Sequence, residues 1–386
     1  MRYLCIYCYL FFLITVSTSA GQYDVYWDCK SAQGYWDNPG SWKQSPDSKG
    51  WSIPGMVTGN ISGVNHGFAR VESGCAIIDA NHMPTSRVER IYVGGPEGAK
   101  LFINGGSLNC NKFFVSYEQG WTGTYVQRAG EVFCESYVCL GEGPNSKTVF
   151  KLLGGKFTAN NKLYSPYTEA DGAVTSIIVD GGYLELFENV YLGKAKGTFA
   201  ELCLMNGKIR HSGNNFSLAF KGKATFNQTG GVFETDDEDR IRLGWIKGSE
   251  ALISISGGEF IARKELAINC GKLIVVGSNA KKIEVFGLSC GSEDSSIEFV
   301  LGRDGVTPVK VKGVEGAKLG SSNLLIGVTD DFKGRPGDVF EVLYAKNIKE
   351  NLKLKNLSDK YIFSYSVADC NAGKVSVLEL KLERVN

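Results

Sequence analysis

The densest charged segment of the chain is an acidic run that ends in two arginines. It reads Glu234-Thr235-Asp236-Asp237-Glu238-Asp239-Arg240-Ile241-Arg242. Carboxylate oxygens are preferred calcium ligands, so we expect Asp236, Asp237 and Asp239 to be candidate ligands for a calcium ion. With the arginines beside them, the same carboxylates also suit an acidic catalytic patch like that of β-helical polysaccharide lyases. The spacing does not match an EF-hand loop, and a solvated turn is the alternative. No catalytic residue is assigned, and no cofactor other than calcium is suggested.

Aromatic side chains at matching positions could bind sugars. Trp121 follows Gly106 at nearly the same interval as Trp245 follows Gly231. Both should fall in a similar turn on one side of the molecule, with Tyr117 nearby. Rings with an apolar face and a polar edge suit sugar stacking, so Tyr117, Trp121 and Trp245 are candidate ligand-binding residues. The alternative is that these rings pack at structural corners.

The first twenty residues have the pattern of a secretory signal peptide. Arg2 precedes an apolar stretch from Leu4 to Val16, and small residues lead up to Ala20. Such a segment is removed on export, so residues 1–20 are expected to be the signal peptide of a secreted or cell-surface protein. No other stretch is long enough for a transmembrane span. The formal net charge is +1, and the absence of a basic excess makes nucleic acid an unexpected partner.

Cysteine pairing is open in an exported chain. Two of the 11 cysteines leave with the signal peptide, so nine remain, and an odd number leaves at least one thiol free or available for self-association. The nine contain no CxxC motif and the chain has three histidines, so a zinc site is not expected. Cys110 and Cys134 each lie four positions after a repeated glycine. We expect them to be neighbours and a candidate disulfide, with buried thiols as the alternative.

The element that must position all these residues is a repeat. A glycine pair or near-pair, one further residue and an apolar residue recur seven times at an almost constant spacing. A second anchor of the form Ile-Tyr-Val-Gly or Val-Tyr-Leu-Gly follows the glycines about half a period later. Short alternating stretches between the anchors predict strands, and glycines at a fixed phase mark corners. The second glycines are Gly106, Gly130, Gly155, Gly182, Gly207, Gly231 and Gly258.

This period predicts an all-β fold, a right-handed parallel β-solenoid (β-helix) with about 24–27 residues per coil, capped at both ends. One coil cannot bury its apolar residues alone, whereas a stack forms a continuous core. A β-propeller blade needs about 40 residues or more. The expected organisation is an N-terminal Trp-rich cap at 21–90, solenoid repeats at 91–290, and terminal coils with a C-terminal β cap at 291–386.

Several segments resemble exported bacterial proteins. The run from Trp27 to Trp42 resembles the start of passenger-type β-solenoids, and residues 337–343 resemble their closing segment. The segments 124–130 and 225–231 resemble autotransporter-associated β-strand repeats. The resemblance covers most of the chain after the signal peptide and implies a fold more than a function. The chain departs from the autotransporter pattern because no C-terminal membrane barrel follows in this sequence.

Three functions are compatible with these observations. The sequence contains no GxSxG, HExxH or P-loop motif, which favours a structural, adhesive or surface-presenting solenoid without intrinsic catalysis. The alternatives are an extracellular carbohydrate-binding protein and a β-helical polysaccharide lyase or hydrolase, with a cell-surface or extracellular polysaccharide as the partner. Aromatic residues aligned on one face without charges would favour binding. A groove lined by Asp, Lys and Arg from successive coils would favour catalysis.

Overall fold

The computed structural model describes residues 24–27, 34–38, 41–44, 68–166, 171–236, 240–370 and 375–386. The predicted signal peptide lies outside these residues. The described residues contain strands and no α-helix, and thus no helix among them is long and apolar enough to cross a membrane. The strands are β1 (Asp24–Trp27), β2 (Gly34–Tyr35), β3 (Trp42–Gln44), β4 (Phe68–Val71), β5 (Gly74–Ile78), β6 (Val88–Val93), β7 (Ala99–Val115), β8 (Thr122–Leu140), β9 (Lys147–Leu152), β10 (Lys156–Ala159), β11 (Lys162–Ser165), β12 (Val174–Leu192), β13 (Phe199–Leu218), β14 (Lys223–Gln228), β15 (Val232–Thr235), β16 (Arg240–Leu243), β17 (Glu250–Ile255), β18 (Gly258–Ile268), β19 (Gly271–Val276), β20 (Ala280–Cys290), β21 (Ser296–Leu301), β22 (Val309–Val311), β23 (Ala317–Leu319), β24 (Asn323–Val328), β25 (Val339–Ala345), β26 (Ile348–Glu350), β27 (Lys353–Asn356), β28 (Tyr361–Cys370) and β29 (Val375–Val385).

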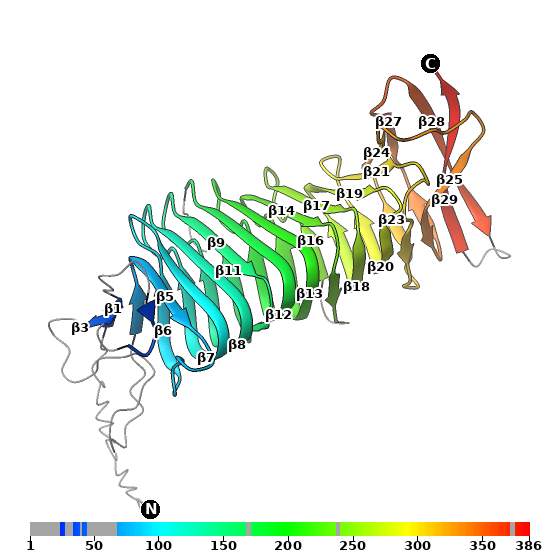
Figure 1. Ribbon diagram of the computed structural model, residues 1–386. Coiled ribbons are helices and arrows are strands. Elements are labelled where there is room, and N and C mark those ends of the chain that lie inside the picture. The colour runs from blue at the N-terminus through cyan, green and yellow to red at the C-terminus, as the bar shows by residue number, and fades with distance from the viewer. Residues whose placement is uncertain are drawn as a thin grey trace, which may run out of the picture.

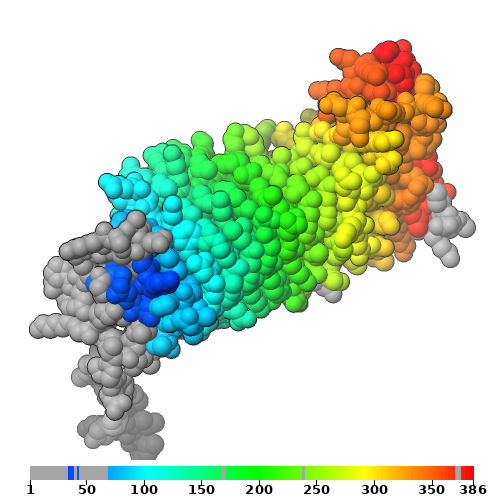
Figure 2. Space-filling model, in the orientation of Figure 1, coloured from blue at the N-terminus to red at the C-terminus, as the bar shows by residue number. Residues whose placement is uncertain are grey.

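The strands form a parallel β-solenoid of about 10 turns, which confirms the predicted fold class. Each coil has three sides, and the coils stack into an elongated rod (Figures 1 and 2). The long strands β7, β8, β12 and β13 run around all three sides, whereas other coils use separate short strands such as β9, β10 and β11. We call the sides first, second and third in chain order, so that β9 lies on the first side, β10 on the second and β11 on the third.

The predicted period is the length of one coil. On the first side, the spacing of Cα partners in neighbouring coils stays within the predicted range from Gly74 to Ala251, as in the pairing of Ala99 with Gly123. Beyond Ala251 the length varies. Ala251 pairs with Gly271 across a shorter coil, and Asn323 pairs with Lys353 across a longer one. The weakening of the repeat after Gly258 therefore reflects coils of unequal length within one continuous stack.

The repeated glycines form the corner between the first and second sides. All seven second glycines have a positive φ, between 63° and 84°, a region that other residues adopt only with strain. At Gly155, a Cβ atom would also lie 2.3 Å from the carbonyl oxygen of Gly130 in the preceding coil. Both the backbone angle and the close stacking of successive corners therefore require glycine here.

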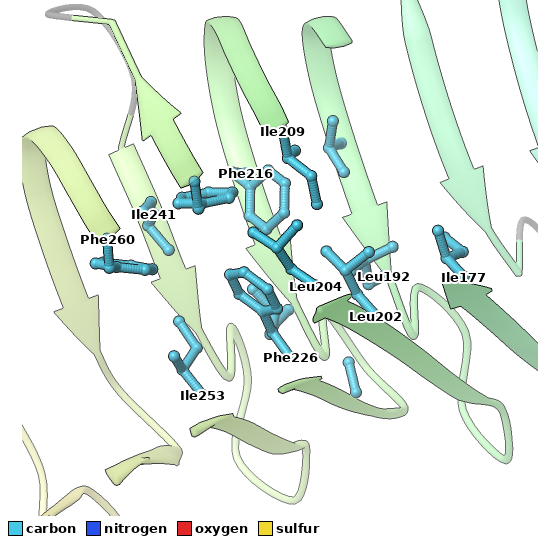
Figure 3. Packing of buried hydrophobic residues seen from close by; sticks show 14 of the residues in the cluster. Ile177, Leu192, Leu202, Leu204, Ile209, Phe216, Phe226, Ile241, Ile253 and Phe260 are labelled. Carbon is cyan, nitrogen blue, oxygen red and sulfur yellow. The ribbon is translucent and has the colours of Figure 1, made fainter. Parts of the chain in front are cut away.

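The interior is filled by side chains that stack from coil to coil. On the first side, Leu202, Phe226 and Ile253 are register partners and are fully or almost fully buried. Figure 3 shows these residues with Phe216, Phe260 and their neighbours pointing into the space that the three sides enclose. This alternation of buried and outward residues explains why each strand has a short alternating pattern.

Two glutamines are buried at the glycine corner. Gln127 donates hydrogen bonds to the carbonyl oxygens of Gly130 and Lys156, at 2.9 and 3.0 Å. Gln228 donates to Glu259 O at 2.9 Å in an equivalent position. Burying these polar side chains is tolerated because their amide groups donate hydrogen bonds to backbone carbonyl oxygens.

The two ends of the rod differ in structure from the repeated coils between them. At the N-terminal end, Trp36 and Trp42 belong to the core and their rings meet edge to face at 4.8 Å, while β1 already pairs in parallel with β4. At the C-terminal end, β29 pairs antiparallel with both β25 and β28 (Figure 1). This antiparallel unit covers the last coils, as expected for a stack that must protect its open edge.

Candidate functional site

The third side carries a row of aromatic residues on its outer surface. Register pairing aligns Tyr92, Phe114 and Cys139 on successive strands, and Tyr164 and Tyr191 continue the same row. Rings from neighbouring positions and from the turns that follow the third side extend it. We call the complete set the aromatic stripe: Phe68, Tyr92, Phe114, Tyr117, Tyr137, Tyr164, Tyr191, Phe220 and Trp245.

The rings of the stripe contact one another across coils. Tyr164 stacks on Tyr191 with ring centroids 5.8 Å apart. Phe220 then contacts both Tyr191, at 5.9 Å, and Trp245, at 5.1 Å. These separations lie within the range of favourable aromatic pairs. The stripe is therefore continuous from the middle of the rod to the turn after β16.

The two halves of the stripe differ in exposure. In the N-terminal half, Tyr92 and Phe114 are only 4% and 3% exposed, because Tyr117 lies edge-on against both rings. In the C-terminal half, Tyr164 and Tyr191 are half-buried, and Trp245 is 37% exposed. The first half is thus a small packed cluster, and the second half presents ring surface to solvent.

Cationic side chains lie over the rings along the stripe. Arg70 lies 4.6 Å from the Tyr92 ring centroid, Lys194 lies 4.4 Å from that of Tyr164, and Arg242 lies 4.0 Å from that of Trp245. Lys112 lies 4.9 Å from the Tyr137 centroid. Each pair has the geometry of a cation–π interaction. The surface consequently offers flat apolar rings and positive charge side by side.

Burial shifts the pKa values of several groups on the stripe. It raises the pKa of Tyr137 to about 12, and the carboxylate of Glu142 contributes to the shift. Burial also raises the pKa of Glu142 itself. The pKa of Lys194 is lowered, first by burial and then by the positive charges of Lys162 and Lys221, although Cys139 acts in the opposite direction. Lys162 and Lys221 therefore lie close enough to Lys194 to repel its ammonium group.

The predicted sugar-binding residues share a corner but have different environments. Trp121 and Trp245 both lie in turns between the third and first sides, as expected, but five coil-to-coil steps apart, which is about 24 Å. Trp245 belongs to the exposed end of the stripe, whereas Tyr117 covers the packed cluster. Trp121 is only 7% exposed, which leaves little ring surface for a sugar. The three rings thus do not form one joint platform.

The predicted calcium ligands are only partly described. Asp236 is half-buried directly after β15 and lines a small cavity of about 260 Å³ with Arg210, Glu234 and Arg263. Asp237 and Asp239 lie outside the described residues. Among the residues that the structure does describe, no group of three or more His, Cys, Asp or Glu side chains is placed to hold a metal ion. Calcium binding by this run stays a prediction.

The predicted cysteine pair is aligned as expected. Cys110 and Cys134 are register partners in β7 and β8, and both side chains are buried. They are present as free thiols, and burial together with the neighbouring Cys134 raises the pKa of Cys110 well above its usual value. The stacking is confirmed, and the covalent bond stays a prediction.

A groove lies beyond the exposed end of the stripe. The turn between β18 and β19 has only two residues, Asn269 and Cys270, whereas the turn after β16 has six. The short turn leaves a groove of about 660 Å³ between its longer neighbours. Two of the lysines that line it are paired with carboxylates, Lys223 with Glu250 at 2.8 Å and Lys272 with Glu298 at 3.1 Å.

Sequence reasoning overlooked the central rings of the stripe. Tyr92 and Tyr191 are the second residues of the recurring four-residue anchor that ends in glycine. In that anchor the first and third residues point inward and the second points outward. The row of outward rings could therefore have been predicted by comparing, from coil to coil, the residue that lies two positions before each anchor glycine.

Comparisons with known proteins add no name to this fold. A scan of the chain against models of protein families finds no match. A search of curated proteins also finds no match.

Proposed function

We propose that this protein is a secreted or cell-surface β-solenoid with an adhesive role, which binds a polysaccharide along the exposed half of its aromatic stripe. The observation that carries the proposal is the continuous row of outward rings from Tyr164 to Trp245. Outward aromatic rings on a soluble protein cost free energy unless something covers them. A row of such rings on consecutive coils is suited to a linear ligand with repeating flat units.

The geometry of the solenoid favours a polymeric ligand over a small sugar. Each coil adds one rung, and rungs lie about 4.8 Å apart. From Tyr164 on β11 to Trp245 after β16 the rings span three coil-to-coil steps, which is about 14 Å. Several rings can therefore contribute to binding one extended chain, each with a modest energy.

The composition of the stripe favours binding over catalysis. Its residues supply ring surface and positive charge, both of which act without any chemical step. Cleavage of a glycosidic bond would additionally need an acid and a base held at one position with tuned pKa values. The passive role in adhesion therefore remains our first proposal for this surface.

We also propose that the chain is related to passenger-type solenoids of exported proteins. The two segments that resemble autotransporter-associated repeats place Gln127 and Gln228 at the same corner, where both bond to backbone carbonyls. A shared structural device at a fixed point of the coil supports the relationship. The predicted signal peptide supports export.

The test is loss of binding on removal of the exposed rings. The double variant Tyr164→Ala/Tyr191→Ala should weaken binding by about tenfold or more, since each ring contact contributes about 1 kcal/mol. The matched control is Tyr183→Ala, which removes an outward, half-buried tyrosine on the second side. Affinity electrophoresis in gels that contain individual polysaccharides measures the effect. Equal retardation of the double variant and the unmodified protein would refute the proposal.

A second candidate is a polysaccharide lyase that uses the same surface. One observation favours it: beside the rings of the stripe lie a carboxyl group with a raised pKa, Glu142, and an ammonium group with a lowered pKa, Lys194. Groups shifted in this way are common at catalytic sites. Release of unsaturated sugars, detected by ultraviolet absorbance and abolished by Glu142→Gln, would establish this activity in place of passive binding.

A further inference from the structure

The charges on the solenoid are arranged differently on its second and third sides. On the second side, lysines pair with carboxylates on the same or neighbouring strands. Lys156 lies 2.8 Å from Glu185, Lys208 lies 2.7 Å from Glu234, and Lys282 lies 2.8 Å from Glu284. These ion pairs neutralise that side within the protein.

The central cations of the third side are not neutralised in this way. Within the part of the chain that the structure describes, no carboxylate oxygen lies within 4 Å of the charged nitrogens of Lys112, Lys162, Lys221 or Arg242. Lys112 and Arg242 instead lie over the rings of Tyr137 and Trp245. Other cations of this side do have carboxylate partners: Arg70 contacts Glu72 at 3.3 Å, and Arg240, on the same strand as Arg242, contacts Glu265 at 2.8 Å.

These cations also repel one another. The positive charges of Lys162 and Lys221 contribute, after burial, to the lowered pKa of Lys194. Burial and then Arg240 likewise lower the pKa of Arg242, although Glu265 acts in the opposite direction. Crowding like charges destabilises a folded protein, and an anion bound among them relieves the repulsion. The excess is local, because the whole chain has a net charge of only +1.

We infer that the ligand of the stripe is an acidic polysaccharide, whose carboxylate or sulfate groups contact the cations of the third side while its sugar rings stack on the aromatic residues. The inference rests on the proposed function and specifies its ligand class. A neutral glycan would leave the positive charges of Lys162, Lys221 and Arg242 without an anionic partner. An acidic glycan uses both features of the surface, because the rings and cations lie side by side along the stack of coils.

The test compares acidic polymers with their uncharged forms. The probes are polygalacturonate, alginate and chondroitin sulfate, each with a partner in which the carboxyl groups are methyl-esterified and any sulfate esters are removed. We expect the acidic form to bind at least about tenfold more tightly, because several ion contacts of modest strength add up along the row. Binding should weaken as salt is raised, since exposed charges are screened.

A triple variant and a double variant separate the charge contribution from general effects. Lys162→Gln/Lys221→Gln/Arg242→Gln should weaken binding of the acidic polymers by about tenfold and flatten the salt dependence. The matched control is Lys156→Gln/Lys208→Gln on the second side, which removes cations that already have carboxylate partners. Thermal unfolding of all variants verifies that they remain folded.

The outcomes distinguish this inference from the proposed function. Equal binding of acidic and uncharged polymers, with loss of both in Tyr164→Ala/Tyr191→Ala, would overturn the inference alone. Binding of none of the probes would overturn both. A single-stranded DNA oligonucleotide serves as a competitor, and tighter binding of the oligonucleotide than of every polysaccharide would show that the site takes a different polyanion and would also overturn the inference.

Discussion

Lys194 lies over two rings of the aromatic stripe. Its ammonium group lies 4.4 Å from the ring centroid of Tyr164 and 5.8 Å from that of Tyr191. Burial lowers its pKa, and the charges of Lys162 and Lys221 lower it further, against the opposing effect of Cys139. Lys194 therefore loses its proton at a lower pH than an ordinary lysine.

This shift predicts the pH dependence of binding. Because the protonated form attracts an anionic ligand, affinity for an acidic polysaccharide should fall as the pH rises through the lowered pKa of Lys194. Tyr137 has a pKa of about 12, so it stays neutral over this range. In Lys194→Arg the charge persists to much higher pH, and the early fall should disappear. Dissociation constants measured between about pH 7 and pH 10 test this, and parallel curves for both proteins would contradict it.

At the same scale, residue identity was informative about position but not about exposure. The spacing of Trp121 and Trp245 from the repeated glycines correctly placed both in turns at one corner. The two turns have the same length, six residues, but Trp121 is the last residue of its turn and Trp245 is the second residue of its own. Trp121 is buried and Trp245 is 37% exposed, so exposure follows from the path of the turn, which the spacing from the glycines does not specify.

The glycine corner is the element that permits the stack to form. Two separate requirements meet at Gly155, a φ of 73° and a distance of only 2.3 Å between a Cβ added at this position and Gly130 O. Gly120 has the same φ of 73°, but no atom lies within 4 Å of a Cβ placed there. The two positions therefore separate backbone strain from steric contact.

Alanine substitutions at these glycines should differ in cost. Gly120→Ala should lower the free energy of unfolding by about 1 kcal/mol, the cost of a left-handed conformation with a side chain. Gly155→Ala should lower it by about 3 kcal/mol or more, because the corner must also move away from the preceding coil. Chemical denaturation of both variants measures the difference. Equal destabilisation would mean that the contact between successive corners contributes little.

The strands and corners that recur in every coil could be predicted from the sequence, whereas features that occur in one coil only could not. Seven glycines and the alternating apolar residues specify the coil, its length and its inward side chains, because these are constrained in every coil by the same neighbours. Outward residues have no such constraint, so the alignment of Tyr164 with Tyr191 becomes evident only when the register between strands is known. The groove at Asn269 and Cys270 arises from a single short turn. The sequence repeat becomes weak in this region, and a weak repeat does not show which turn is short.

At the scale of the whole molecule, the rod behaves as a one-dimensional array. Each coil contacts mainly the coils on either side, so stability is approximately a sum over coils and their interfaces. The stripe follows the same rule, because its rings and cations are contributed one rung at a time. Removing a coil that carries part of the stripe should therefore shorten both the rod and the binding surface. Removing any other coil should shorten the rod alone.

Removing complete coils tests both properties in one experiment. Deleting residues 183–207 joins Gly182 to Lys208, the register partner of Tyr183, so every later coil keeps its register. Deleting residues 272–295 does the same further along, since Lys272 pairs with Ser296. Both proteins should fold with a maximum dimension about 5 Å shorter, measured by solution scattering. Deleting only residues 183–194 should unfold the array, because it removes about half a coil and every later coil would lose its register with the coil before it.

The two complete deletions should differ in binding. The first removes Tyr191 and Lys194 from the middle of the exposed stripe, whereas the second removes a coil that lies beyond Trp245 and leaves the stripe whole. Affinity for the polysaccharide should therefore fall in the first variant and stay unchanged in the second, although both lose one coil of core. If both deletions weakened binding equally, the ligand would contact the rod over its entire length, and the stripe would not be the binding surface.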